Sequence, residues 1–173
     1  MSEKEQACLF RTWVGQYLAL IGRIARAYTA SEEDCEDLVQ EVLLQVWRSI
    51  PRFEGRASAS TWIYRVALHT ALAWQRKDRR RRERFLPLLE VPAAEEPGES
   101  NTGQTDEIVG LLYAAIRRLP KADAALVLLY LDDLSYRDMA EILGITESHV
   151  GVKLNRARKQ LAELMKGVAH ELR

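Results

Sequence analysis

The stretch YRDMAEILGITESHVGVKLNRARKQL, residues 136–161, predicts two helices joined by a tight turn. Gly144 can adopt the positive φ that lets a chain leave a helix, Ile145 follows as the apolar residue of the turn, and Thr146 can cap the next helix through its side-chain oxygen. Apolar residues recur at helical spacing: Met139, Ala140, Ile142 and Leu143 in the first helix, and Val150, Leu154, Ala157 and Leu161 in the second. The pattern is typical of a helix-turn-helix.

The second helix of this pair carries cationic side chains on its remaining faces. Lys153, Arg156, Arg158 and Lys159 lie off the apolar stripe. Such groups can meet phosphates or base edges when a recognition helix enters the major groove of DNA. A helical hairpin with an ordinary solvated basic face is the alternative interpretation.

The composition limits the class of protein. The chain has 173 residues, 47% of them hydrophobic, which allows two small domains with buried cores. No apolar run approaches the roughly 18–20 residues of a membrane span, and Met1 to Glu5 begins no signal peptide, so we expect a cytoplasmic protein without membrane insertion. Cys8 and Cys35 are expected as reduced thiols, and the scattered histidines suggest no metal site; we also expect no cofactor.

Charge is segregated along the chain although the formal net charge is zero. An acidic block (Glu32, Glu33, Asp34, Glu36, Asp37, Glu41) precedes a basic block (Arg76, Lys77, Arg79, Arg80, Arg81, Arg82, Arg84). A second acidic stretch follows, with Glu90, Glu95, Glu96, Glu99, Asp106 and Glu107. The segregation indicates surfaces with different partners.

Hydrophobic periodicity predicts an all-α fold of two small helical domains joined by a linker. Helices are expected over residues 9–28, from the Ser31 cap to Pro51, over 61–75, 106–119 and 122–131, and then in the helix-turn-helix. Residues 52–60 read as a loop. Residues 87–105 are rich in Pro, Gly, Glu and Ser and predict a flexible acidic linker. The expected domains are therefore residues 1–86 and 106–173, on either side of the linker 87–105.

Four segments, in order, resemble the extracytoplasmic-function (ECF) RNA polymerase sigma factors of the sigma-70 family. They are DCEDLVQEVLLQVW (34–47), RFEGRASASTWIYRVALHT (52–70), Leu119-Pro120 with Leu134-Ser135-Tyr136, and Gly144-Ile145 with Arg156-Ala157-Arg158. The first segment resembles the helix of region 2 with which members of that family bind the β′ coiled coil of polymerase. The second resembles the melting loop and minus-10 helix, and the others resemble region 4.

The resemblance implies a docking face and a set of partners. By residue-by-residue match, Asp37, Gln40 and Glu41 would bind polymerase, with Trp47 as an apolar anchor at the edge. The partners implied are core RNA polymerase (its β′ coiled coil and β flap), promoter DNA and an anti-sigma factor. From the residues alone, the same polar face could simply be solvated.

For the minus-10 element, the resemblance implies contacts by residues of the third expected helix and the basic block: Trp62, Tyr64, Arg65, His69, Arg76 and Lys77. Trp62 and Tyr64 can equally be core aromatics, because an aromatic pair at helical spacing usually packs inside. His69 stands where many family members have Asn, which affects the expected base preference.

For the minus-35 element, the resemblance implies contacts by residues at the start of the last helix: Ser148, His149, Val152, Lys153, Asn155 and Arg156. Here the chain departs from the usual Gly-Thr-Val-Lys/Arg-Ser-Arg run, since Gly151 and Val152 stand where polar or basic readers are common. Gly inside a helix costs about 1 kcal/mol relative to Ala, which suggests either a close backbone approach or a tolerated weakness. Val152 can meet a thymine methyl group. The expected minus-35 preference therefore differs from the common one.

The expected function is that of a non-enzymatic specificity subunit for RNA polymerase, with no catalytic residues. A stand-alone helix-turn-helix regulator is the runner-up, but it leaves the segments around residues 34–47 and 61–65 unexplained. A helical nuclease could use Asp34, Asp37 and Glu41 as metal ligands, although the apolar periodicity argues against their convergence.

Overall fold

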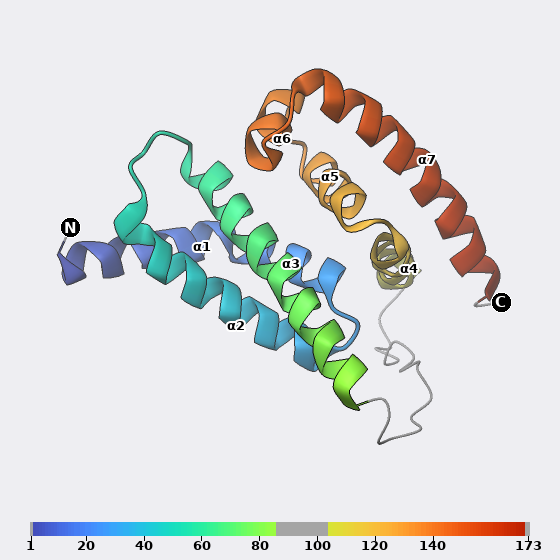
Figure 1. The fold of residues 1–173 in the computed structure, drawn as a ribbon, viewed down its shortest axis with the longest axis horizontal. Helices are drawn as coiled ribbons and strands as arrows, with labels where there is room; N and C mark the ends of the chain where they lie inside the picture. The colour runs from blue at the N-terminus through green and yellow to red at the C-terminus, as the bar shows by residue number, and fades with distance from the viewer. Residues whose placement is uncertain (1, 86–103, 172–173) are drawn as a thin grey trace. The chain divides into compact units, whose positions relative to one another are not determined.

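The computed structural model describes residues 2–85 and 104–171, and in these ranges the chain forms helices and connecting turns without strands. The chain divides into two compact units, residues 1–99 and 100–173. The all-α prediction is confirmed (Figure 1). The predicted linker lies outside the described residues except for Gln104 and Thr105, which open a helix.

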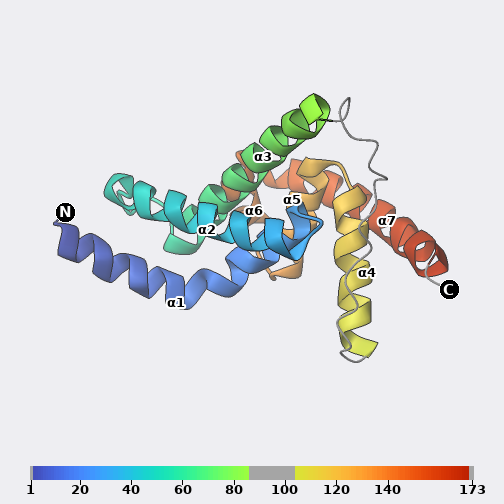
Figure 2. The same cartoon turned by 90° about the horizontal axis from the view of Figure 1, so that it is seen from below.

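The first unit is built from α1 (Glu3–Tyr28), α2 (Glu32–Ser49), a 3-10 turn η1 (Ile50–Arg52) and α3 (Ala59–Phe85). Each of the three long helices packs against the other two, and Figures 1 and 2 show them side by side. Their shared core consists mainly of Trp13, Ile21, Ile24, Leu38, Val42, Val46, Ile50, Ile63, Ala67 and Ala71. The side chain of Gln75 also donates to the carbonyl of Tyr28 at 3.0 Å, which ties α3 to the end of α1.

Local capping sets where the first helices begin and end. Ser2 and Glu5 form a capping box, so α1 starts several residues earlier than periodicity alone predicted. The hydroxyl of Ser31 accepts from the Asp34 N–H at 3.1 Å, which confirms the predicted cap of α2. The α-helix ends at Ser49, and Pro51 occupies the following 3-10 turn. Burial at the end of α1 raises the pKa of Tyr28 because the interior disfavours phenolate.

The third helix is longer than predicted. It was expected to end at Gln75 but continues to Phe85 through the basic block. Arg, Lys, Gln and Glu are good helix formers, and no Gly or Pro occurs between Ala59, where α3 begins, and Pro87. The missing apolar stripe beyond Gln75 hid this extension, because periodicity detects only helices that face a core.

The second unit consists of α4 (Gln104–Arg118), α5 (Lys121–Leu131), α6 (Tyr136–Leu143) and α7 (Glu147–Glu171). The last helix packs against each of the other three. Core side chains include Ile116, Leu126, Leu129, Met139, Ile142, Val150, Leu154 and Ala157. The helix α5 is apolar almost all round and buries every residue from Ala124 to Leu129.

The turn between α6 and α7 has the predicted helix-turn-helix geometry. Gly144 adopts φ of 67°, and the N–H of Ile145 reaches back to the carbonyl of Ala140 at 3.1 Å. Thr146 then caps α7, because its hydroxyl accepts from the His149 N–H at 3.2 Å. Ser135 caps α6 in the same way.

Within the described ranges, no helix combines the length and the apolar character needed to cross a membrane. Cys8 and Cys35 are both free thiols, as predicted.

The two glycines of the helix-turn-helix should respond in opposite ways to alanine. At Gly144 the positive φ strains any L side chain, so Gly144→Ala should lower the stability of the second unit by about 1 kcal/mol. At Gly151 an added Cβ would meet Tyr136 Cε2 at 3.4 Å, an ordinary contact, so Gly151→Ala should raise stability by up to about 1 kcal/mol.

Hydrogen exchange of residues 104–171 in the full chain would measure both effects, with Gly167→Ala as an exposed helical control. Destabilisation by Gly151→Ala would show that the Tyr136 ring cannot accept the extra methyl group.

Candidate functional site

The outward face of α2 carries most of the predicted docking residues. Asp37 and Gln40 are exposed, and Glu41 is half-buried at the edge of this face. The side chain of Gln45 donates to Glu41 Oε1 at 2.7 Å, which holds the carboxylate in place. Leu44 lies one turn beyond Gln40 and is 42% exposed, so an apolar side chain stands within the polar face.

Trp47 does not belong to the outward face. Its half-buried ring packs edge-on against Phe10 with ring centroids 5.4 Å apart. The side-chain amide of Gln6 also donates to the Trp47 carbonyl at 2.9 Å. Trp47 therefore joins α2 to α1, and Leu44 is the exposed apolar residue that the sequence analysis missed.

A groove of about 510 Å³ runs between α2 and α3. We call it the α2/α3 groove. It is lined by Glu41, Gln45, Ser49, Trp62, Arg65, Val66, His69, Thr70, Ala73, Trp74 and Lys77. The groove thus brings one predicted docking residue, Glu41, together with four predicted minus-10 residues: Trp62, Arg65, His69 and Lys77.

The indole of Trp62 is fixed from two sides. Its Nε1–H donates to Ser49 Oγ at 3.1 Å, and that hydroxyl donates in turn to the Val46 carbonyl at 2.9 Å. The ring also packs against Phe53 with centroids 5.6 Å apart, and Phe53 meets the buried Trp13 at 5.0 Å. Trp62 remains half-exposed, so a held aromatic surface is available to a ligand.

A smaller pocket of about 170 Å³ lies under the loop that follows η1. We call it the loop pocket. Its lining is Arg52, Phe53, Glu54, Gly55, Arg56, Ala57, Trp62 and Arg65. Trp62 and Arg65 line both cavities, so the loop pocket and the α2/α3 groove share a wall. In the loop, Arg56 pairs with Glu54 at 2.7 Å, and Gly55 has φ of 71°.

Tyr64 belongs to the core. It is 2% exposed and lines neither cavity, because it projects from α3 on a different side from Trp62. The core interpretation therefore applies to Tyr64 and not to Trp62.

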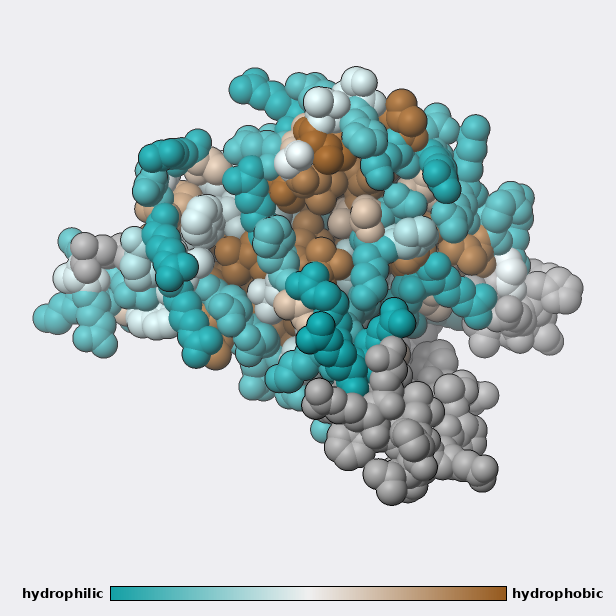
Figure 3. Space-filling view, in the orientation of Figure 1, coloured by the Kyte–Doolittle hydropathy of each residue, from teal (hydrophilic) through white to brown (hydrophobic). Residues whose placement is uncertain are grey.

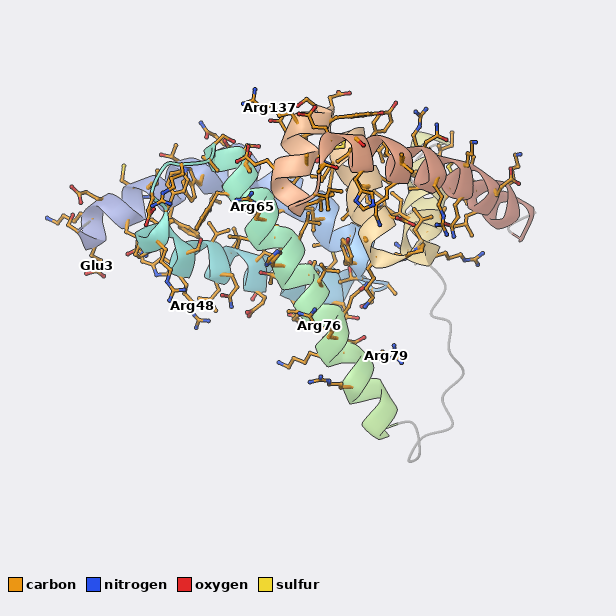
Figure 4. All side chains as sticks on the ribbon, turned by 45° about the horizontal axis from the view of Figure 1, so that its top comes forward. Glu3, Arg48, Arg65, Arg76, Arg79 and Arg137 are labelled. Atoms are coloured by element: carbon orange, nitrogen blue, oxygen red, sulfur yellow. The ribbon has the colours of Figure 1, made fainter. Side chains whose placement is uncertain are left out.

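The basic residues of α3 continue outward along the same helix. Arg76, Lys77, Arg79 and Arg80 are exposed. Figure 4 shows Arg65, Arg76 and Arg79 emerging from successive parts of α3, and Figure 3 shows mostly hydrophilic side chains on the face of the molecule where α3 lies. Such a row is suited to a phosphate backbone.

In the second unit, the predicted minus-35 residues gather on the first turns of α7. Ser148, His149, Val152, Asn155 and Arg156 are exposed, and Lys153 is half-buried. Val152 is 72% exposed, which is unusual for a valine and leaves its methyl groups available. Arg158 is directed elsewhere, since its guanidinium carbon lies 4.8 Å from the centre of the Tyr130 ring on α5.

Gly151 lies against an aromatic ring of the neighbouring helix α6. The ring of Tyr136, at the start of α6, lies against the position where a Cβ would be, at 3.4 Å. Tyr136 itself remains 44% exposed. This is an ordinary contact with a side chain, so among the described residues no backbone approaches Gly151 closely enough to require glycine there.

The metal ligands of the nuclease alternative would be acidic residues of α2. Among the described side chains, no group of three or more His, Cys, Asp or Glu residues is placed to hold a metal ion. The nuclease alternative requires Asp34, Asp37 and Glu41 to converge, and it gains no support.

Family comparisons match both units. The family model for Sigma-70 region 2 matches residues 13–81, and that for Sigma-70, region 4 matches residues 110–161. The ECF RNA polymerase sigma factor SigX of Bacillus subtilis is 30% identical over 142 residues, covering 79% of this chain and 73% of SigX. The ECF RNA polymerase sigma factor SigM of Mycobacterium tuberculosis is 29% identical over 143 residues, covering 83% and 70%.

A solved structure has the same fold. The sigma factor RpoE from Bartonella quintana, co-crystallised with the anti-sigma factor NepR, gives a TM-score of 0.70 at 22% identity, covering 91% of this chain and 96% of RpoE. A stand-alone helix-turn-helix regulator does not account for the match over residues 13–81. The chain belongs to the ECF RNA polymerase sigma factors of the sigma-70 family, which are transcription initiation factors.

Proposed function

We propose that the first unit binds core RNA polymerase and opens the minus-10 element, while the second unit grips the minus-35 duplex. The observation that carries this proposal is the α2/α3 groove, where Glu41 of the docking face meets Trp62, Arg65 and His69. Polymerase docking and strand capture then occur on adjacent surfaces of one rigid helical unit.

The proposed polymerase contact is the outward face of α2. Its polar members are Asp37, Gln40 and Glu41, and its apolar member is Leu44. Exposed polar groups around a single apolar side chain match the anatomy of interfaces, where a few apolar residues supply much of the binding energy. The β′ coiled coil is the proposed partner of this face, and the β flap that of the second unit.

Promoter opening requires a site for an unstacked base. Trp62 supplies a fixed aromatic surface, and the loop pocket beside it is lined by Arg52, Glu54 and Arg56, which can hydrogen-bond a base edge. Arg65 lines both the loop pocket and the α2/α3 groove, and His69 lines the groove. Arg76 and Lys77 extend the cationic surface for the backbone.

Minus-35 recognition is assigned to α7. The exposed valine at position 152 favours a thymine methyl group, whereas His149, Asn155 and Arg156 can reach base edges or phosphates. Ser148 and Lys153 complete the proposed surface.

Residues 1–86 and 106–173 are the proposed domains, with 87–105 as their linker. The chain acts by binding energy alone, as a non-enzymatic factor without a cofactor, in the cytoplasm where polymerase works. An anti-sigma factor is a further proposed partner, supported by the RpoE–NepR complex.

Replacing two polar residues of the docking face should abolish initiation. For Gln40→Ala with Glu41→Ala, we expect at least about a tenfold loss of affinity for core polymerase, because desolvated polar partners lose their hydrogen bonds. Run-off transcription on a randomised promoter library, with core polymerase from a bacterium, would measure the loss and reveal the promoter elements. Gln16→Ala, an exposed change on α1, is the control. Unchanged initiation by the double variant would contradict the docking assignment.

Leu44 and Trp47 should separate binding from folding. Leu44→Ala should weaken polymerase binding about fivefold and leave the free energy of unfolding within about 0.5 kcal/mol, because the side chain is substantially exposed. Trp47→Ala should destabilise the first unit by about 2 kcal/mol, because it removes the packing on Phe10. Urea unfolding and a polymerase binding titration would test both. If Trp47→Ala weakened polymerase binding without lowering stability, and Leu44→Ala did not weaken binding, Trp47 would be the apolar anchor of the docking face.

Val152 should influence base preference at one minus-35 position. For Val152→Ser, we expect the preference for thymine to fall about fivefold, because the apolar contact with the methyl group is lost. Sequencing of transcripts from the promoter library would show the change at one position, with Gln160→Ala on an exposed later turn of α7 as the control. An unaltered preference would remove Val152 from the reading surface.

A further inference from the structure

The α2/α3 groove includes an aromatic side chain, Trp74, that the proposed function does not use. The far end of the groove is formed by Ala73, Trp74 and Lys77, on the turns of α3 that follow His69. Trp74 is half-buried, like Trp62, and both indoles line the same groove. At a rise of about 1.5 Å per residue, the two tryptophans are separated by about 18 Å along the helix.

The lining of this far end is suited to nucleic acid. Trp74 offers an aromatic surface, Lys77 a cation, and Thr70 a hydroxyl that is already donating to the Val66 carbonyl at 2.7 Å. Glu41 is the single carboxylate of the lining, and it accepts a hydrogen bond from Gln45. Aromatic surfaces alternating with cationic groups along a groove are the features that bind single-stranded DNA without sequence preference.

We propose that Trp74 is a second base-stacking site, which holds the separated promoter strand at a distance from Trp62. The inference rests on the proposed function and adds a binding subsite to it. The occupant is one DNA strand, with one base against Trp74 and an adjacent phosphate near Lys77. The continuity of the groove with the Trp62 surface and its cationic far end are the grounds for this choice.

The spacing has a consequence for the position of the bound bases. A DNA strand advances about 3.4 Å per nucleotide when stacked, so 18 Å corresponds to about five nucleotides and to fewer when the strand is stretched. The bases at Trp62 and Trp74 should therefore be about three to five nucleotides apart. Because stacking tolerates any base, Trp74 sets the lifetime of the opened complex and leaves promoter choice unchanged.

Photocrosslinking tests the subsite directly. The full chain with core polymerase would be mixed with promoter DNA containing a preformed bubble, with 5-iodouracil placed at one bubble position at a time. Mass spectrometry then identifies the crosslinked residue. We expect crosslinks to Trp62 and Trp74 from iodouracils about three to five nucleotides apart. Crosslinking to Trp62 without any crosslink to Trp74 overturns the inference and leaves the proposed function standing.

A substitution series separates stacking from packing. Trp74→Leu should shorten the lifetime of the opened complex at least about fivefold, and Trp74→Phe should restore much of it, because a base stacks on Phe but not on Leu. Thermal unfolding of each variant would be recorded in parallel. Equal lifetimes for the Leu and Phe variants would show that Trp74 only packs between the helices. If the wild-type chain does not bind core polymerase, the proposed function itself is refuted.

Discussion

The hydrogen bond from the Trp62 indole to the Ser49 hydroxyl is the constraint on which the first unit's functional surface depends. It joins the end of α2 to the beginning of α3 across the intervening loop. The same hydroxyl also donates to the carbonyl of Val46, a buried residue of α2. The indole is therefore held in a fixed position relative to α2. The loop pocket and the α2/α3 groove share the wall that this bond holds. A side chain with fixed orientation offers a stacking surface without a further entropic cost on binding.

The same arrangement relates the two proposed activities of the unit. Glu41 and Gln45 lie on α2, in the groove wall opposite α3, while Gln40 and Leu44 are exposed on the same helix. A partner that binds the outward face of α2 therefore holds the helix that also forms the groove. The proposed docking surface and the proposed strand-capture surface are thus joined by the packing of α2 on α3.

The sequence allowed the helix-turn-helix to be predicted in detail, because its signals are local. Gly144, Thr146 and the apolar spacing around them act within a few residues. The sequence did not reveal that Trp47 packs on Phe10 while Leu44 is exposed, since the roles of two apolar residues on one helix depend on what α1 brings against them. Trp74 was missed for a related reason: only the packing of α2 on α3 reveals that it lines a groove.

The contact between Tyr136 and Gly151 has a consequence for how this protein can change. The ring from one helix occupies the space that a larger side chain on another would need, so the effects of substitution at the two positions are not additive. A longer side chain at position 151 would extend toward this ring, which is 44% exposed and would have to move aside. The residue at position 136 therefore influences which side chains the recognition surface can acquire at position 151 during divergence.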